Sequence, residues 1–211
     1  MKKLVKFKTN KGMTHLIFSQ GHPEYSRGMT YIELIVVLSI FSVMSSVVLF
    51  NYGEFQAKVD LKNLASDIAL KVVEAQNASL SGKLPVQSFG ANWKPSYGIY
   101  LNITTPTQFI YFVDLNNLNG YESGEMLDTI SITKANFIDK IEKCTGDTCA
   151  SSEPISPLSI AFKRPDSSAI FKDSNGITLN NNFDYIKITI KSPKGVTAFV
   201  RIYLSGRIQV N

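Results

Sequence analysis

The sequence GMTYIE at residues 28–33 stands directly before an apolar run at residues 34–50 and determines how the chain is organised. A single carboxylate, that of Glu33, lies at the start of this run. A charge at the centre of a membrane helix costs roughly 2.5 to 3.5 kcal/mol, so this acid requires a partner or a place near the interface. No charged residue occurs at positions 34–53. A segment of this length suffices for an α-helix to span ~30 Å of hydrocarbon, so we predict a membrane-spanning helix.

The formal charge of the chain is concentrated before this segment. The 211 residues carry a formal net charge of +5. Residues 1–28 hold six basic residues and one acidic residue, so they account for all of it. Lys and Arg before an apolar helix stay on the cytoplasmic side, which places the rest of the chain outside. The apolar run is not followed by an A-x-A-like cleavage site, so it differs from an ordinary secretory signal.

An amphipathic pattern continues the helix beyond residue 53. Small and apolar residues recur at steps of three and four, while charged residues mostly occupy the positions between them. The recurring residues are Ala57, Leu61, Leu64, Ile68, Val72, Ala75 and Ser79. Ser81 and Gly82, followed by Pro85, predict the end of the helix. We therefore predict one helix over residues 30–81, about 78 Å long at 1.5 Å per residue and without a sharp kink.

The remaining residues predict an antiparallel β-rich head. Short runs rich in Ile, Val, Thr, Tyr and Phe alternate with clusters of Pro, Gly, Asn and Asp. The predicted strands are residues 97–103, 108–113, 158–163, 169–172, 185–191 and 197–204, and residues 207–210 complete a C-terminal meander. Residues 128–142 fit either a strand or a short helix. The predicted fold class is α+β, a long N-terminal helix with a membrane-spanning first half, packed on an antiparallel β-sheet head.

The segment at residues 28–33, with the basic tail before it and the apolar run after it, resembles a type IV prepilin processing site. In that family a prepilin peptidase cuts after the glycine and methylates the new N-terminus, and the glutamate pairs with the terminal amine of a neighbouring subunit. The resemblance implies that Gly28 ends the leader, Met29 becomes the methylated N-terminus and Glu33 is the assembly residue. Met29 replaces the commoner phenylalanine. A plain single-pass anchor is the alternative, but it gives Glu33 no role.

Segments at residues 73–83, 112–117 and 203–208 are similar to the GspH/FimT group of minor pseudopilins. This resemblance implies a pilin-like head of two packed β-sheets against the helix. The implied organisation is a basic leader at residues 1–28, a membrane or filament-core helix at 29–53, an amphipathic helix at 54–83 and a β-rich head at 84–211.

The resemblance also implies partners and a location. The partners are a prepilin peptidase, other pilin or pseudopilin subunits, an inner-membrane assembly platform, and membrane lipid before assembly. We expect a single-pass protein of the cytoplasmic (inner) membrane, with the leader cytoplasmic and the head extracytoplasmic, and later an extracellular or periplasmic filament. The expected function is that of a minor pilin or pseudopilin precursor, a structural subunit of a type IV pilus or a type II secretion pseudopilus.

Enzymatic and metal chemistry have little support in the sequence. Both histidines, His15 and His22, lie in the leader, so residues 29–211 lack histidine for triad catalysis or zinc binding. We expect no catalytic residue, no cofactor and no metal. The oxygen-rich residues 114–122 resemble a calcium loop, but Leu118 occupies a position that needs Asp or Asn in an EF-hand. An Asn-Gly hairpin turn is the favoured interpretation, and calcium binding is the alternative.

Two further sets of residues carry hypotheses. Cys144 and Cys149 enclose a short polar loop in a domain placed outside the cytoplasm, which predicts a disulfide, with two free thiols as the alternative. The C-terminal region is locally basic through Lys187, Lys191, Lys194, Arg201 and Arg207. In FimT-like minor pilins such a region binds DNA for uptake, so the alternative function is a DNA-binding minor pilin. Charges on an alternating strand usually form a solvated face, and we expect no specific nucleic-acid binding.

Overall fold

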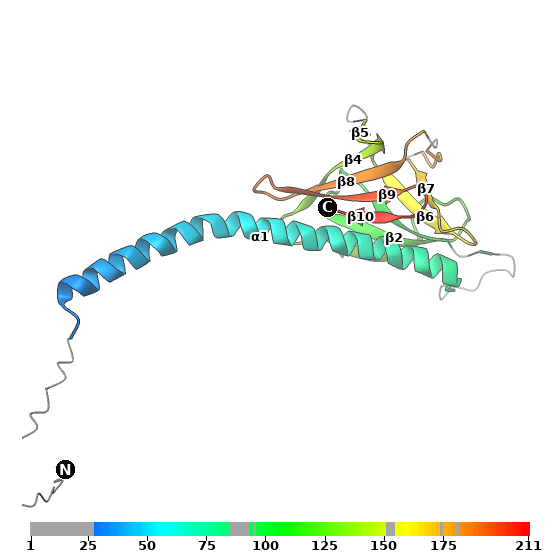
Figure 1. The fold of residues 1–211 in the computed structure, drawn as a ribbon. Coiled ribbons are helices and arrows are strands. Elements are labelled where there is room, and N and C mark those ends of the chain that lie inside the picture. Colours follow the sequence, from blue (N-terminus) through cyan, green and yellow to red (C-terminus); the bar gives the residue numbers. More distant parts are fainter. Residues whose placement is uncertain (1–27, 85–92, 95, 151–154, 174, 180–181) are drawn as a thin grey trace, which may run out of the picture. The chain divides into compact units, whose positions relative to one another are not determined.

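The computed structural model describes residues 28–84, 93–94, 96–150, 155–173, 175–179 and 182–211. It has an α+β fold, in which one long helix and two antiparallel five-stranded sheets form the described chain (Figure 1). The chain divides into two compact units, Met1–Ser46 and Val47–Asn211. The helix α1 (Tyr31–Ser81) contributes its first part to one unit and the remainder to the other.

The start of α1 is capped by its own sequence. The backbone N–H of Glu33 donates to Thr30 Oγ1 at 3.4 Å, and the N–H of Leu34 donates to the Thr30 carbonyl at 3.1 Å. Thr30 is therefore the N-cap, and Glu33 is the third helical residue of a T-x-x-E pattern. An acid in this first turn is also stabilised by the positive end of the helix dipole.

The end of α1 is a Schellman motif, which confirms the predicted stop at Ser81 and Gly82. The N–H of Gly82 donates to the Ser79 carbonyl at 3.1 Å, and that of Lys83 donates to the Ala78 carbonyl at 3.0 Å. Gly82 has a φ of 67°, a left-handed conformation in which glycine lacks the Cβ penalty. Pro85, the other predicted stop signal, lies outside the described residues.

The first sheet has the strand order β3-β2-β1-β6-β7. Its strands are β1 (Ser96–Leu101), β2 (Gln108–Asp114), β3 (Met126–Ser131), β6 (Leu158–Lys163) and β7 (Ala169–Lys172). The second sheet has the order β10-β9-β8-β4-β5. Its strands are β4 (Phe137–Thr145), β5 (Thr148–Cys149), β8 (Tyr185–Lys191), β9 (Thr197–Tyr203) and β10 (Ile208–Val210). The predicted C-terminal meander is thus confirmed as β8, β9 and β10.

Residues 128–142, for which the sequence allowed either a strand or a short helix, belong to two β-strands and the turn between them. This stretch contains most of β3 and the first part of β4, separated by a turn in which Lys134 and Ala135 have positive φ. Strand β4 pairs with β8 and has a register shift between Ile138 and Lys140. The bulge interrupts the alternation that would have identified a strand in the sequence.

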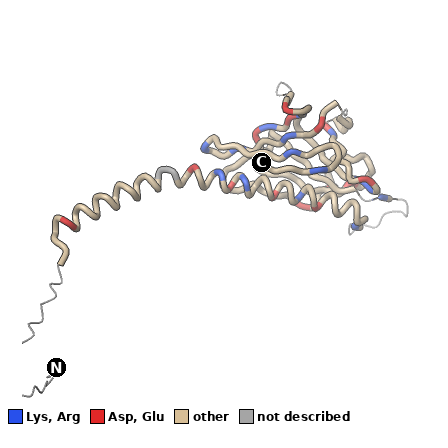
Figure 2. Tube along the Cα trace, in the orientation of Figure 1, with Lys and Arg blue, Asp and Glu red and all other residues tan. Residues whose placement is uncertain are grey.

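The core lies between α1 and the two sheets. The helix contributes Leu61, Ala65, Ile68, Val72 and Ala75, all with no exposed surface, which confirms the amphipathic pattern. The sheets contribute buried strand residues that include Tyr97, Ile99, Ile160, Ile186, Ile188, Val200 and Ile202. Figure 2 shows charged residues along the part of α1 that belongs to the head, whereas the earlier part is almost free of them.

Candidate functional site

The proposed processing point precedes α1 and is open to solvent. Gly28, Met29 and Thr30 are exposed and non-helical, and the Met29 side chain is 63% exposed. Apart from Gly28 itself and its chain neighbours, no described residue has a heavy atom within 4 Å of the position where a Cβ of Gly28 would stand. An extended, uncovered backbone is what a peptidase requires for access. Residues 1–27, the remainder of the expected basic leader with His15 and His22, lie outside the described residues.

The Glu33 side chain is exposed at the start of α1. Its backbone N–H is used by the Thr30 cap, whereas its carboxylate has no hydrogen bond or ion pair within the described part of the chain. The cap is thus made by the Thr30 hydroxyl and the Glu33 backbone alone, and the sequence interpretation missed it, although Thr30 directly before the helix was its signal. The cap leaves the carboxylate available for a partner outside the chain.

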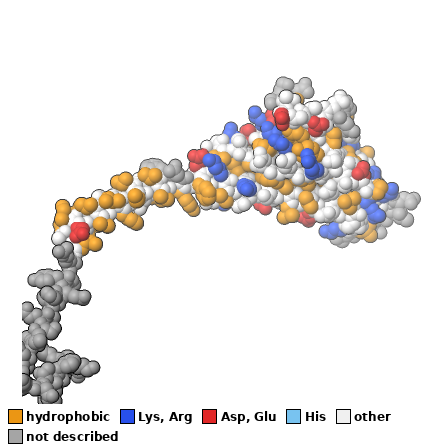
Figure 3. Space-filling view, viewed as in Figure 1, with side chains coloured by type: hydrophobic (Ala, Val, Ile, Leu, Met, Phe, Trp, Pro, Cys, Tyr) orange, Lys and Arg blue, Asp and Glu red, His pale blue; other side chains and the backbone are white. Residues whose placement is uncertain are grey.

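The apolar run after Glu33 is also unburied. One helix, α1, is long and apolar enough to cross a membrane, judged on the described residues. Large side chains along it are exposed, among them Ile35, Phe41, Met44 and Leu49. Figure 3 shows hydrophobic side chains along this part of the helix. Exposed apolar surface of this extent requires lipid or protein around it.

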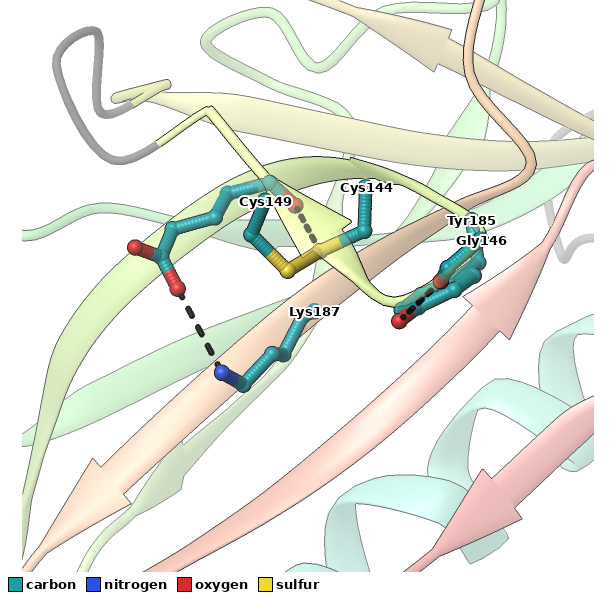
Figure 4. Close-up of polar contacts among 6 residues, drawn as sticks. Cys144, Gly146, Cys149, Tyr185 and Lys187 are labelled. Atoms are coloured by element: carbon teal, nitrogen blue, oxygen red, sulfur yellow. Dashed lines mark hydrogen bonds and ion pairs between the residues drawn. A yellow bond between two sulfur atoms is a disulfide. The ribbon is translucent and has the colours of Figure 1, made fainter.

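Cys144 and Cys149 form the predicted disulfide, which joins β4 to β5 with a Cα–Cα distance of 4.0 Å (Figure 4). The loop between them is also tied to the start of β8. The backbone N–H of Gly146 donates to Asp184 Oδ2 at 2.7 Å, and the Tyr185 hydroxyl donates to the Gly146 carbonyl at 3.1 Å. Gly146 has a φ of 56°, so a side chain there would be strained. The disulfide therefore secures a loop that two further hydrogen bonds hold in place.

The five basic residues of the C-terminal region are spread along one hairpin. Lys187 and Arg201 lie directly opposite each other across β8 and β9. Lys191 ends β8, and Lys194 lies in the turn between β8 and β9. Arg207 lies at the opposite end of the hairpin, in the turn before β10. The structure therefore brings together Lys187 and Arg201 and separates Lys194 from Arg207.

Aromatic rings lie beneath these cations. The Arg201 guanidinium lies 5.3 Å from the ring centroid of Tyr185 and 5.0 Å from that of Phe199, and the Arg207 guanidinium lies 3.7 Å from that of Tyr203. Neither arginine has an ion pair within the described residues. Lys187 does, at 3.7 Å from Glu142 on β4 (Figure 4). Stacking holds the two guanidinium groups while leaving their charge available to an anion.

A surface pocket of about 520 Å³ lies beside Arg201. Its other lining residues are Gly146, Asp147, Asp184, Tyr185, Tyr203, Leu204 and Ser205. The Arg201 Nε atom is shielded from solvent and has no hydrogen-bond acceptor among the described residues. The two acidic residues reduce the positive character of the pocket, so its electrostatics are mixed.

The loop considered for calcium is organised around two buried carboxylates, those of Asp114 and Glu125. The Asp114 oxygens accept from the N–H groups of Leu118 and Asn119 at 3.2 and 2.9 Å. The Glu125 oxygens accept from Leu115 and Glu122, both at 2.9 Å. Burial raises the pKa of Glu125, and the two N–H groups oppose this shift.

The predicted Asn-Gly hairpin turn at Asn119 and Gly120 is therefore wrong as a two-residue turn. The connection between β2 and β3 is a wider loop, and Asn117 and Asn119, but not Gly120, have positive φ. A two-residue type I′ turn would need positive φ at both Asn119 and Gly120. Within the described residues there is no group of three or more His, Cys, Asp or Glu side chains that could hold a metal ion. The carboxylates bind the backbone of their own loop instead.

Comparison of the chain with protein-family models, with curated proteins and with solved structures returned no match.

Proposed function

We propose that this chain is a prepilin-type precursor whose mature form is a minor structural subunit of a type IV pilus or a type II secretion pseudopilus. The observation that carries the proposal is the Glu33 carboxylate, which has no partner among the described residues and is exposed at the start of a membrane-length apolar helix. An exposed Gly28–Met29 junction lies just before it. The two antiparallel sheets packed on α1 are compatible with a pilin-like head of the GspH/FimT group.

The proposed sequence of events begins in the cytoplasmic membrane. The basic leader stays on the cytoplasmic side, the apolar part of α1 spans the bilayer, and the head lies outside. A prepilin peptidase cleaves after Gly28, and methylation follows at the new N-terminus of Met29. Cleavage removes the basic residues of the leader and leaves a formally neutral chain.

In the filament, the Glu33 carboxylate accepts a charge-assisted hydrogen bond from the N-terminal amine of a neighbouring subunit. Such a bond is strong in an apolar surrounding, because water competes little for either partner. The contact also removes the cost of an isolated charge among apolar helices. The Thr30 cap fixes the backbone of Glu33 at the third helical position, which positions the side chain for this contact.

Replacing Glu33 with Ala tests the assembly role. We expect the variant to be cleaved and inserted but to enter filaments at least about tenfold less well, because a hydrogen bond to a charged group contributes ~1.5–3 kcal/mol. Thr30→Ser is the matched control, since it keeps the hydroxyl that caps the helix and leaves the carboxylate, so it should enter filaments normally. Incorporation would be measured by immunoblotting sheared filaments against the membrane fraction. Normal incorporation of the Glu33 variant would rule out the proposed contact.

A DNA-binding minor pilin is the second candidate. Its supporting observation is the pair of stacked arginines, Arg201 and Arg207, which lack ion pairs in the described part of the chain. The acidic residues Glu142, Asp147 and Asp184 on or beside the same surface count against a continuous phosphate track. We therefore rank this function second.

Titration of the mature protein with duplex DNA at several salt concentrations separates the two functions. For a structural subunit we expect no affinity tighter than ~10⁻⁵ M at physiological salt, which is in the non-specific range. A sub-micromolar, salt-dependent complex would reverse the ranking. In that case, replacing Lys187, Lys191 and Arg201 with Gln should reduce the salt slope by about one for each phosphate group that the variant no longer binds.

A further inference from the structure

One end of the head carries cations and aromatic side chains immediately after the apolar run of α1. Tyr52 and Phe55, just past residue 50, are 59% and 63% exposed. The turn between β8 and β9 places Lys194 beside the same stretch of helix, where its ammonium group occupies the space in which a side chain of Gly53 would begin. Lys191 ends the strand that leads into this turn. We call Tyr52, Phe55, Lys191 and Lys194 the collar.

The turn that carries Lys194 is ordered by its own hydrogen bonds. The Ser192 N–H donates to the Val196 carbonyl at 2.9 Å, and the Gly195 N–H donates to the Ser192 carbonyl at 2.9 Å. Gly195 has a φ of 81°, which suits glycine. The position of Lys194 next to the helix is therefore a property of the folded hairpin.

The described acidic residues near the collar pair with lysines outside it. Glu54 forms an ion pair with Lys58 at 2.9 Å, and Asp60 forms one with Lys134 at 2.6 Å. Neither Lys191 nor Lys194 forms an ion pair with a described residue. Lys194 also lines an open surface hollow together with Glu54 and Lys58. Figure 3 shows basic and acidic side chains together at this end of the head.

We propose that the collar docks the head on the bilayer surface by binding the phosphate groups of anionic lipids. Residues just beyond a membrane-spanning segment lie at headgroup depth, since a helix rises only 1.5 Å per residue. Tyrosine side chains are enriched at that depth, and a lysine near an anionic surface contributes about 1 kcal/mol. The lipid-bound head is the state from which a subunit is later extracted. The inference rests on the membrane stage of the proposed function and is independent of filament assembly.

The test compares the full chain in nanodiscs of phosphatidylcholine alone and of an equal mixture of phosphatidylcholine and phosphatidylglycerol. A short pulse of acetic anhydride followed by mass spectrometry measures the acetylation rate of each lysine. We expect Lys194 and Lys191 to react about fivefold more slowly in the anionic discs, a ratio that corresponds to ~1 kcal/mol for each lysine. Added salt should restore the rates, because it screens exposed charges.

Lys163 is the internal control, because it lies near the C-terminal end of α1, far along the helix from the collar. Lys163 pairs in register with Ser96, and the next residue, Tyr97, donates its N–H to Ser79 of α1. The acetylation rate of Lys163 should be the same in both discs. Lys58, which lines the same surface hollow as Lys194, should also be acetylated more slowly in the anionic discs. The variant Lys191→Gln/Lys194→Gln should lose this slowing at Lys58, whereas Lys163→Gln should retain it. Equal rates for Lys194 in both discs, or an equal decrease at Lys163, would overturn the proposal.

Two additional outcomes distinguish the alternatives. If inorganic phosphate added to phosphatidylcholine discs slows Lys194 to the same extent, the collar binds a free anion and membrane docking is wrong. If the chain fails to insert in either disc, the membrane stage of the proposed function is wrong as well. A chain that inserts but shows equal rates contradicts the collar alone.

Discussion

The backbone N–H of Tyr97 donates a hydrogen bond to Ser79 Oγ at 2.8 Å, which joins the first residues of β1 to the last turn of α1. Both residues are buried, and the Tyr97 hydroxyl donates to the Lys83 carbonyl at 2.7 Å just beyond the helix. The long helix and the first sheet are therefore connected by polar contacts as well as by apolar packing.

Replacing Ser79 with Ala should lower the free energy of unfolding by about 1–3 kcal/mol, because the Tyr97 N–H is left buried without an acceptor. Urea denaturation of the mature protein in detergent, followed through the single tryptophan, would measure the change. Ser66→Ala is the control, since Ser66 Oγ donates to the Lys62 carbonyl on the exposed face of the same helix. That variant should remain within about 0.5 kcal/mol of the parent protein.

The disulfide should contribute modestly to stability. Cys144→Ser/Cys149→Ser should lower the free energy of unfolding by about 2 kcal/mol or less, since closing so short a loop restricts few unfolded conformations. The bonds from Gly146 to Asp184 and Tyr185 should keep the loop in place, with faster hydrogen exchange at Gly146. Thiol counting on the non-reduced protein checks the bridge itself. Complete unfolding of the serine variant would show that the bridge contributes far more than the chain-entropy argument allows.

The raised pKa of Glu125 predicts the direction of one pH effect. A carboxyl whose pKa is higher in the folded state than in the unfolded state binds more protons when folded, so its contribution to stability falls as pH rises through that pKa. The free energy of unfolding should therefore decrease as pH rises through the window between the usual glutamate pKa and the raised value. The Glu125→Gln variant should lack this decrease, and Glu122→Gln should retain it. A parent protein whose stability rises through this window relative to Glu125→Gln would contradict the assignment.

Much of the fold follows from local patterns in the sequence. The three- and four-residue spacing identified the face of α1 that contains Leu61, Ile68 and Val72, and alternation identified β8. Strand β3 was missed as a separate element because nearly all of it is exposed, so its sequence MLDTIS lacks a buried face. It is a strand because it pairs with β2 at the edge of the sheet. Strand β5 has only two residues and depends on its pairing with β4 across the disulfide.

The candidate site was predictable to a different degree at each position. The spacing from Gly28 to Glu33 is the basis of the proposed processing segment, and the same sequence contained the Thr30 cap. The burial of Asp114 and Glu125 could not be inferred, since acidic residues among Asn and Gly indicate an exposed loop. Their positions depend on long-range packing, such as the bond from the Tyr121 N–H to Ser159 Oγ. The proximity of Lys194 to Gly53 likewise appears only when the hairpin is folded against the helix.

The N-terminus of the mature protein tests the central claim most directly. The full chain would be expressed with a prepilin peptidase, purified from membranes and analysed by intact-mass and terminal-peptide mass spectrometry. A prepilin-type precursor predicts cleavage after Gly28 and an N-methylated Met29, with Gly28→Ala as the variant that leaves the leader attached. Recovery of the intact leader on the parent chain in the presence of an active peptidase would contradict the account.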